Sequence, residues 1–197
     1  MTKVLILGAH GQIARVATNM FLAESDAELT LYLRNVRRLN GIGHPGRVRV
    51  IEGDVMDAES LRTAMDGQDV VYANLSGDLE GQARHIVAAM KATGVRRLIF
   101  ISSMGIYDEV PGQRYDSILD PYRNAANVIE NSGLDYTIVR PAWLNNKDEI
   151  AYGTTQKGEP FANPDAVVSR KSVADLVVKL ALTPHAEMRS SLGVHKN

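Results

Sequence analysis

The chain has 197 residues, of which 45% are hydrophobic and 23% are charged, and its formal net charge is -1. This composition predicts one globular domain with a sizeable core, and the near-zero charge argues against a nucleic-acid-binding surface. The chain contains no cysteine, which excludes disulfides, thiolate catalysis and cysteine metal sites.

A strand is predicted within three residues of the N-terminus, so we expect no signal or transit peptide. No apolar run approaches the roughly 20 residues that span a bilayer. We therefore expect a soluble, cytoplasmic protein with no membrane partner, and we predict no metal site.

The first predicted unit is a strand, a glycine turn and the start of a helix. Residues 4–7 form a continuous aliphatic run, as in a strand that is buried on both faces of a parallel sheet. Gly8 and Gly11 follow in the spacing G-x-x-G-x-x-A, and apolar residues then recur at helical spacing over 13–23. A helix that begins directly after a strand offers free N–H groups and a positive dipole end, so this turn is predicted to bind the pyrophosphate of a dinucleotide.

Residues 29–33 form the second predicted strand, which ends at Arg34. In an NAD-binding unit an acid near this position accepts a hydrogen bond from the ribose 2′-hydroxyl, but none lies between Leu29 and Arg38. Arg34, with Arg37 and Arg38 one turn later, instead suits a 2′-phosphate and can stack on adenine. The arginines favour NADP(H) over NAD(H), the alternative being a solvated basic loop.

Residues 47–51 are the third predicted strand, and Asp54 follows at its carboxyl end. Asp54 either accepts a hydrogen bond from the adenine amino group, with Val55 packed on the ring, or serves as a turn acid or helix cap. A short helix is expected over 58–65, with Asp57 as its candidate cap.

Residues 69–73 are the fourth predicted strand, followed by a turn at Asn74, Leu75 and Ser76 that contains small polar residues. These residues would face the middle of the cofactor. A helix is expected over 79–93.

The remaining elements continue the alternation of strands and helices. They are a fifth strand at 97–101 that opens into Ser102 and Ser103, an irregular exposed loop at 108–120, a helix at 121–131, a sixth strand at 136–140 cut off by Pro141, a polar segment at 145–164 with a candidate strand at 152–155, and a helix at 172–182. This alternation predicts an α/β fold, a doubly wound parallel sheet in the three-layer Rossmann arrangement. We expect a single NAD(P)-binding domain over 1–197, with a small substrate-side lid at about 142–168.

Several stretches of the chain carry a resemblance to one family. They are GAHGQI at 8–13, GDV at 53–55, ISSMGIY at 101–107, SGLDYTIVRP at 132–141 and VSRKSVAD at 168–175. With them the chain resembles the atypical short-chain dehydrogenase/reductase family with an NAD(P)H-binding Rossmann domain, the NmrA-like and biliverdin/flavin reductase-like proteins. His10 stands where threonine is usual.

The resemblance implies roles for the site residues. The glycine turn would hold the pyrophosphate through Gly8, Gly11, Gln12 and Ile13, with His10 either reaching a phosphate or facing water. The rest of the cofactor would contact Arg34 at the 2′-phosphate, Asp54 and Val55 at adenine, Asn74, Leu75 and Ser76 at the ribose, and Pro141 at the nicotinamide, with Ser102 as a further contact.

Catalytic members of the family carry Tyr-x-x-x-Lys on the helix after the fifth strand, where the lysine lowers the pKa of the tyrosine that supplies the proton. Counting back from Ser132, the lysine position is Tyr122 and the tyrosine position is Ile118. In the other register Tyr122 is the tyrosine and Ala126 replaces the lysine. Without the lysine, a tyrosine keeps a pKa near ~10 and is a poor proton shuttle at neutral pH.

Three side chains are the catalytic candidates. Ser103 would orient the substrate carbonyl, and solvent would deliver the proton. Tyr107 and Tyr122 are candidate proton donors or ring-stacking walls, the alternative for each being ordinary packing. Trp143 is either a core residue or a substrate wall.

Three functions compete. The first is an NADPH-dependent oxidoreductase that passes hydride to a small, planar, electron-poor substrate such as a quinone or flavin. The missing lysine favours the second, a non-catalytic NADP(H)-binding redox sensor that signals to a partner protein. The third, a nucleotide-sugar epimerase or dehydratase, is weaker because such enzymes need the Tyr/Lys pair. We expect a small-molecule substrate, no nucleic acid, and a monomer or homodimer.

Overall fold

Eight strands form one sheet in the order β3-β2-β1-β4-β5-β6-β10-β8 in the computed structural model, which describes residues 1–39 and 46–197. The strands are β1 (Lys3–Leu7), β2 (Glu28–Leu33), β3 (Val48–Glu52), β4 (Val70–Ala73), β5 (Arg97–Ile101), β6 (Asp135–Pro141), β8 (Gly153–Gln156) and β10 (Ser190–His195). Every neighbouring pair is parallel except β10 and β8. The predicted parallel sheet is therefore confirmed, with one antiparallel strand at its edge.

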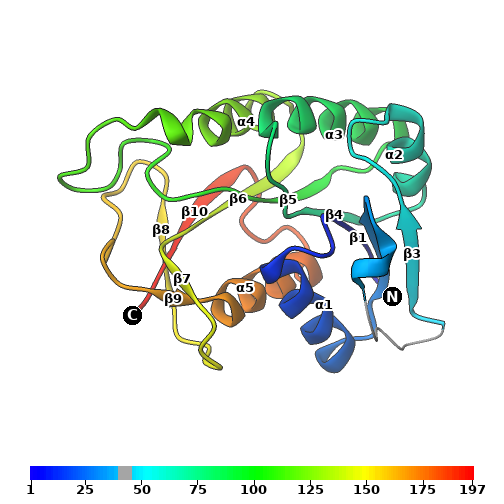
Figure 1. Ribbon diagram of the computed structural model, residues 1–197, viewed down its shortest axis with the longest axis horizontal. Helices are drawn as coiled ribbons and strands as arrows, with labels where there is room; N and C mark the ends of the chain where they lie inside the picture. Colours follow the sequence, from blue (N-terminus) through cyan, green and yellow to red (C-terminus); the bar gives the residue numbers. More distant parts are fainter. Residues whose placement is uncertain (40–45) are drawn as a thin grey trace.

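Helices cover both faces of this sheet (Figure 1). One face carries α1 (Gln12–Glu24) and α5 (Arg170–Leu182), which pack on each other. The opposite face carries α2 (Ala58–Met65), α3 (Leu79–Thr93) and α4 (Asp120–Glu130) as a row of neighbours. The doubly wound, three-layer prediction is confirmed. Within the described residues, no helix combines the length and the apolar character needed to cross a membrane.

The aliphatic run of β1 is buried on both faces of the sheet, as its continuous pattern predicts. Val4 and Ile6 pack into the core beneath α1 and α5, whereas Leu5 and Leu7 pack into the core beneath α2, α3 and α4. Alternate residues of a strand face opposite sides of a sheet, so a strand between two helical layers needs apolar residues at every position.

The end of β6 differs from the prediction. Pro141 was expected to cut the strand off, but it is the last residue of β6 and pairs with Val194 of β10. Its carbonyl also accepts a hydrogen bond from the backbone N–H of Met104 at 3.2 Å. Proline lacks a backbone N–H group but keeps its carbonyl. It is therefore tolerated at the end of a strand where only the carbonyl forms a hydrogen bond.

The chain after α5 contains a strand that the sequence analysis missed. β10 lies between β6 and β8, with Leu192 and Val194 buried. Its buried Ser191 accepts a hydrogen bond from the side chain of Arg140. A strand that carries polar and glycine residues at buried positions lacks the aliphatic pattern from which the other central strands were predicted.

The segment at 142–168 is anchored at both ends through a two-stranded parallel sheet of β7 (Leu144–Asn145) and β9 (Val168–Ser169). Ser169 caps α5 and donates a hydrogen bond to the carbonyl of Glu149 at 2.6 Å. The backbone N–H of Ala151 donates to Ser172 at 3.0 Å. These contacts fix the base of the segment against α5, and its role as a lid stays a prediction.

Candidate functional site

The carboxyl ends of the parallel strands meet at one edge of the sheet, where a cavity of about 340 Å³ opens beside β1, β2, β3 and β4. The strand order reverses between β1 and β4, which is where open α/β sheets bind ligands. The cavity is lined by Gly8, His10, Gly11, Tyr32, Leu33, Arg34, Asn35, Arg38, Gly53, Asp54, Val55, Asn74, Leu75, Ser76 and Gln82. All the predicted cofactor contacts lie there except Gln12, Ile13, Ser102 and Pro141.

Gly8 and Gly11 form a turn that is packed tightly against Asn74. Gly8 has a φ of +74°, and a Cβ added there would lie 2.2 Å from the backbone oxygen of Asn74. A Cβ on Gly11 would lie 2.2 Å from Nδ2 of the same residue. The two glycines are therefore required by the contact between the turn and the end of β4, in addition to the close approach predicted for a phosphate.

We expect Gly8→Ala to destabilise the fold more than Gly11→Ala. At position 8 a left-handed backbone combines with a collision against backbone, whereas at position 11 the obstacle is the end of a side chain. Urea unfolding should show a loss of about 2–4 kcal/mol for Gly8→Ala. Asn74→Ala should relieve the effect of Gly11→Ala only, and equal losses for both glycine variants would contradict this account.

Helix α1 begins at the cavity without a side-chain cap. Among the described residues, no side chain accepts a hydrogen bond from its first turn, and that turn contains no acid. In contrast, Asp57, Asp78 and Ser169 cap α2, α3 and α5. The N–H groups and positive dipole end of α1 are thus available to an anion, which fits the pyrophosphate of a dinucleotide.

Two arginines bring positive charge to the cavity. Arg34 and Arg38 line it, whereas Arg37, the other arginine of this turn, does not. Asn35 fixes the turn by accepting a hydrogen bond from the backbone N–H of Arg37 at 3.1 Å. Within 1–39 and 46–197, none of these arginines forms an ion pair with a carboxylate, so both lining guanidinium groups suit a phosphate.

Asp54 has the predicted turn role and lies at the cavity, and its contact with adenine stays a prediction. Its Oδ1 accepts a hydrogen bond from the backbone N–H of Met56 at 2.9 Å, which is the turn role, and the residue also lines the cavity. Its backbone oxygen accepts a hydrogen bond from the buried Tyr32 hydroxyl at 2.8 Å, and burial raises the pKa of that hydroxyl. Val55 is buried beside it, and Asp57 caps α2 as predicted.

Gln82 of α3 lines the cavity on the side of β4 and was missed by the sequence analysis. Its Nε2 donates a hydrogen bond to the carbonyl of Ser76 at 3.1 Å. Its Oε1 is buried and has no hydrogen-bond partner in the described part of the chain. The sequence pattern predicted helix α3, but it did not show which of the polar side chains of this helix contacts the turn after β4.

The remaining cofactor candidates lie outside the cavity. Gln12 is exposed at the start of α1, and Ile13 is buried in the core, so Ile13 can offer a ligand only its backbone N–H. Ser102 and Pro141 lie at the ends of β5 and β6, the strands that follow β4 along the sheet. The Ser102 hydroxyl is buried, with no hydrogen-bond partner among the described residues. Its predicted contact with a cofactor stays a prediction.

Ser103 follows directly on the same edge and is partly exposed. Its hydroxyl donates a hydrogen bond to the backbone carbonyl of Met104 at 3.1 Å. This is a local contact to the next residue, so the hydroxyl can rotate to donate to a substrate instead.

The Tyr107 hydroxyl is already engaged with a carboxylate. It donates to Glu130 at 2.7 Å, and the ring lies near the guanidinium of Arg140 and the ammonium of Lys157, at 5.2 and 4.2 Å from its centroid. Burial raises the pKa of this hydroxyl well above its usual value. These contacts match the packing alternative and occupy the hydroxyl that a proton donor would need.

Tyr122 lies near the start of α4, half-buried against the core, and no described residue forms a hydrogen bond with its hydroxyl. Ile118, the other candidate position, is 70% exposed. Helix α4 contains no lysine, so neither register of the family motif gives a Tyr/Lys pair.

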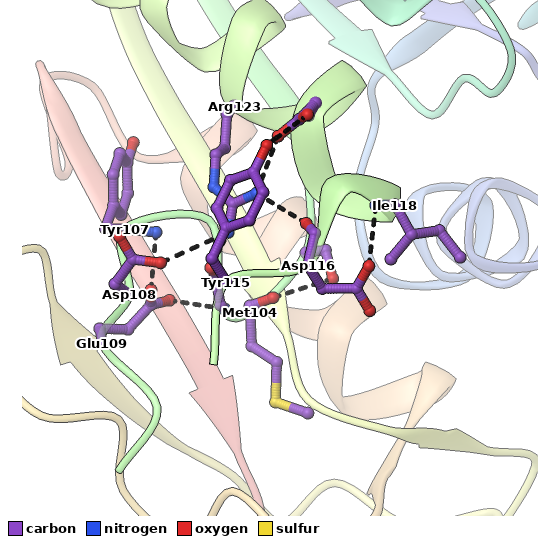
Figure 2. A network of polar contacts seen from close by, with 11 residues as sticks. Met104, Tyr107, Asp108, Glu109, Tyr115, Asp116, Ile118 and Arg123 are labelled. Atoms are coloured by element: carbon purple, nitrogen blue, oxygen red, sulfur yellow. Dashed lines mark hydrogen bonds and ion pairs between the residues drawn. The ribbon is translucent and has the colours of Figure 1, made fainter. Parts of the chain in front are cut away.

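The loop after β5 is held by Arg123 of α4 (Figure 2). Its guanidinium donates to the carbonyls of Asp116 at 2.8 Å and Gly105 at 3.2 Å, and it pairs with the carboxylates of Asp120 and Asp108. These contacts join both ends of the loop to α4 beside the end of β5. Apart from one 3-10 turn at Ser117–Leu119, the loop is therefore ordered by side chains rather than by regular structure.

Glu109 corrects the prediction that this loop is exposed throughout. Its carboxylate accepts hydrogen bonds from the backbone N–H groups of Gly105 at 2.9 Å and Tyr107 at 2.8 Å (Figure 2). It also forms an ion pair with Arg140, and the two side chains are only 4% and 0% exposed. Arg140 donates further to Ser191 of β10 at 3.0 Å, so the arginine of the Val-Arg-Pro run ties the loop to the sheet.

Within the described part of the chain, no group of three or more His, Asp or Glu side chains could hold a metal ion. The donors at the sheet edge are backbone N–H groups, arginines and small polar side chains. This set suits a phosphorylated organic cofactor.

Comparisons with known proteins indicate an NAD(P)H-binding family. A family model described as NAD(P)H-binding matches residues 8–184. The chain is 28% identical to the uncharacterized sugar epimerase YhfK of Bacillus subtilis, covering 89% of this chain and 86% of that protein. It is 29% identical to the (4-alkanoyl-5-oxo-2,5-dihydrofuran-3-yl)methyl phosphate reductase of Streptomyces griseus, covering 89% of this chain and 61% of that protein.

Two solved structures are similar over nearly the whole chain. A Rossmann-fold NAD(P)-binding family protein from Shigella flexneri is 43% identical, with a TM-score of 0.89 over 100% of this chain and 94% of that one. A short-chain dehydrogenase/reductase from Veillonella parvula in complex with NADP is 31% identical, with a TM-score of 0.89 over 99% and 94%. The chain therefore belongs to the NAD(P)H-binding Rossmann family of atypical short-chain dehydrogenases/reductases.

Proposed function

We propose that the protein is an NADPH-dependent oxidoreductase that reduces a small, planar, electron-poor molecule such as a quinone or a flavin. The observation that carries the proposal is the cavity where the strand order reverses between β1 and β4. The uncapped start of α1 lies at this cavity, and so do Arg34 and Arg38, which form no ion pair within the described residues. A reductase among the relatives supports the reaction class.

Different residues of the chain bind different parts of the cofactor. The first-turn N–H groups of α1 hold the pyrophosphate, and Arg34 and Arg38 hold the 2′-phosphate. NADPH, when bound, supplies a hydride, and one proton from water completes the reduction of a quinone to a hydroquinone. Ser103 donates a hydrogen bond to the substrate carbonyl and so orients it.

A substrate of this kind accounts for the missing Tyr/Lys pair. Hydride addition to a quinone or a flavin leaves an anion whose charge is delocalised, so protonation does not need a strong positioned acid. A simple ketone would leave an alkoxide, for which the absent pair would be required. The lack of a lysine on α4 also disfavours an epimerase, since epimerases depend on the same pair.

The reductase proposal is tested by mixing the purified protein with NADPH and a panel of quinones and flavins. We expect oxidation of NADPH with at least one member of the panel, read as the loss of nicotinamide absorbance. Ser103→Ala should lower kcat/KM about tenfold or more, because it removes a hydrogen bond to developing negative charge. Ser190→Ala, at the opposite end of the sheet, is the matched control and should keep the activity.

The second candidate is a redox sensor that binds NADP(H) without turnover, and the absence of the Tyr/Lys pair favours it. Tight NADPH binding with no oxidation across the whole panel would contradict the reductase proposal and support the sensor. Activity that Ser103→Ala leaves unchanged would remove Ser103 from the mechanism.

A further inference from the structure

Trp143 is the only tryptophan of the chain, and it is 67% exposed. Of the two alternatives that its sequence position left open, the core residue is therefore wrong. Aromatic side chains dominate the energetics of cores and interfaces, so an indole ring left in water offers a large apolar surface to a ligand. A single exposed apolar residue is ordinary, however, and the argument depends on what surrounds it.

Trp143 shares an apolar face with Val167. Strands β7 and β9 pair through Leu144 and Val168, and the backbone carbonyl of Trp143 accepts a hydrogen bond from the N–H of Val168 at 2.8 Å. Leu144 and Val168 pack into the core beneath α1 and α5. The residue before each of them points to the other face of this small sheet, so Trp143 lies beside Val167, which is 41% exposed.

This face begins at the edge of the main sheet where the substrate is proposed to bind. The carbonyl of Pro141 accepts a hydrogen bond from the backbone N–H of Met104, the residue after Ser103. The N–H of Ala142 is still bonded to β10, so the chain continues along the direction of β6 as far as Trp143. From the usual rise along a strand and the spacing between strands, the backbones of Ser103 and Trp143 lie roughly 10 Å apart. One molecule with a flat ring can therefore contact both side chains.

The indole ring favours ligands of a particular shape and electron density. Aromatic rings that stack with an offset gain free energy beyond that of the apolar area they bury. Indole is rich in electrons, whereas the rings of quinones and flavins are poor in them, which strengthens such a stack. A second fused ring covers more of the indole than a single ring does and removes more apolar surface from water.

We infer that Trp143 is a specificity residue of the substrate site, where it stacks on the substrate ring and selects fused-ring quinones and flavins over single-ring quinones. The inference rests on the proposed function for the reaction. Ser103 donates to the substrate carbonyl, while Trp143 holds the ring and Val167 extends the apolar face. Trp143 therefore affects the binding of the substrate and neither the transfer of hydride nor the binding of NADPH.

The first test compares KM for benzoquinone and naphthoquinone at saturating NADPH. We expect wild type to have a KM for naphthoquinone about tenfold below that for benzoquinone. Trp143→Ala should bring the two KM values within about threefold of each other, while kcat and the dissociation constant of NADPH stay unchanged. Trp143→Phe keeps a flat ring and should keep most of the preference.

Val50→Ala is the matched control. Val50 is 44% exposed, as a surface valine comparable to Val167, but it lies on β3, the edge strand at the other end of the sheet from β6. We expect Val50→Ala to keep both KM values of wild type. Val167→Ala should raise KM for naphthoquinone by about two- to threefold, because it removes part of the apolar face.

The second test uses the fluorescence of Trp143, because no other residue contributes tryptophan emission. NADP⁺ replaces NADPH, so that the cofactor site is filled and no hydride is transferred. Naphthoquinone should quench the emission along a saturable curve in the same concentration range as its KM. Free N-acetyltryptophanamide, titrated in the same way, corrects for absorption and for collisions in solution.

The outcomes separate this inference from the reductase proposal. Oxidation of NADPH without saturable quenching, or with a naphthoquinone preference that Trp143→Ala retains, overturns the role of Trp143 and leaves the reductase proposal standing. Saturable quenching without any oxidation supports the ring-binding role of Trp143 and contradicts the reductase proposal. If naphthoquinone causes neither quenching nor oxidation and flavins are not reduced, both are wrong.

Discussion

Arg34→Ala is expected to weaken NADPH binding by about 10- to 100-fold and to change NADH binding by less than about twofold. Hydrogen bonds to a charged partner contribute about 1.5–3 kcal/mol, and each 1.4 kcal/mol is a factor of ten in affinity. NADH lacks the 2′-phosphate and so loses no such bond. Arg38→Ala, on the same side of the cavity, should act in the same direction. Dissociation constants for both cofactors give the answer directly.

Arg37→Ala is the matched control for this experiment. Arg37 belongs to the same short turn and is exposed like Arg34 and Arg38, but it does not line the cavity. We expect it to keep the NADPH affinity of wild type. Equal losses for NADPH and NADH in Arg34→Ala would show that the arginine does not read the 2′-phosphate.

Glu109→Gln is expected to lower the free energy of unfolding by about 3–5 kcal/mol, because it leaves the charge of Arg140 buried without its partner. Both side chains of this pair are almost fully buried, and the carboxylate also holds the backbone of the loop after β5. For a chain of this length such a loss lowers Tm by roughly 10 °C. Urea and thermal unfolding measure the effect.

The control for the buried pair is an exposed one. Glu80→Gln breaks the ion pair with Arg84 on the surface of α3 and should cost less than about 0.5 kcal/mol. The double variant Glu109→Leu/Arg140→Met should be more stable than Glu109→Gln, since no unpaired charge remains buried. Similar losses for Glu109→Gln and Glu80→Gln would show that the buried pair does not hold the loop.

The sequence predicted those parts of the molecule whose cause is local. The aliphatic run of β1, the glycine turn and the cap of α2 at Asp57 depend on residues that are close along the chain, and all three are present as expected. The position of Arg34 at the end of β2 follows from the same local pattern, because parallel strands all end at one edge. The cofactor-binding half of the site could therefore be predicted from the sequence.

The parts that the sequence did not predict depend on contacts between distant residues. β10 is held by β6 and β8, and its buried Ser191 is paired with Arg140, which lies 51 residues earlier. In the sequence Glu109 is an ordinary acidic residue of a loop, and only the fold brings it into an ion pair with Arg140. Gln82 is one of several polar residues on α3, and only the fold shows which one faces the cavity. None of these contacts leaves a periodic pattern in the sequence.

The catalytic half of the site shows the same limit. Tyr107 follows the serines in a stretch that resembles the family, yet Glu130 takes its hydroxyl, 23 residues later in the chain. Ser103 remains as the candidate that orients a substrate. The structure thus gathers most of the predicted cofactor residues at one cavity, whereas α4 offers no Tyr/Lys pair for the reaction.

The central claim is that the cavity beside β1, β2, β3 and β4 holds NADP(H) by its 2′-phosphate. The most direct test is calorimetric titration of the wild-type protein with NADPH and with NADH under the same conditions. The account predicts one NADPH bound per chain, with an affinity at least tenfold higher than that for NADH. Equal affinities for the two cofactors, or no binding of either, would contradict it.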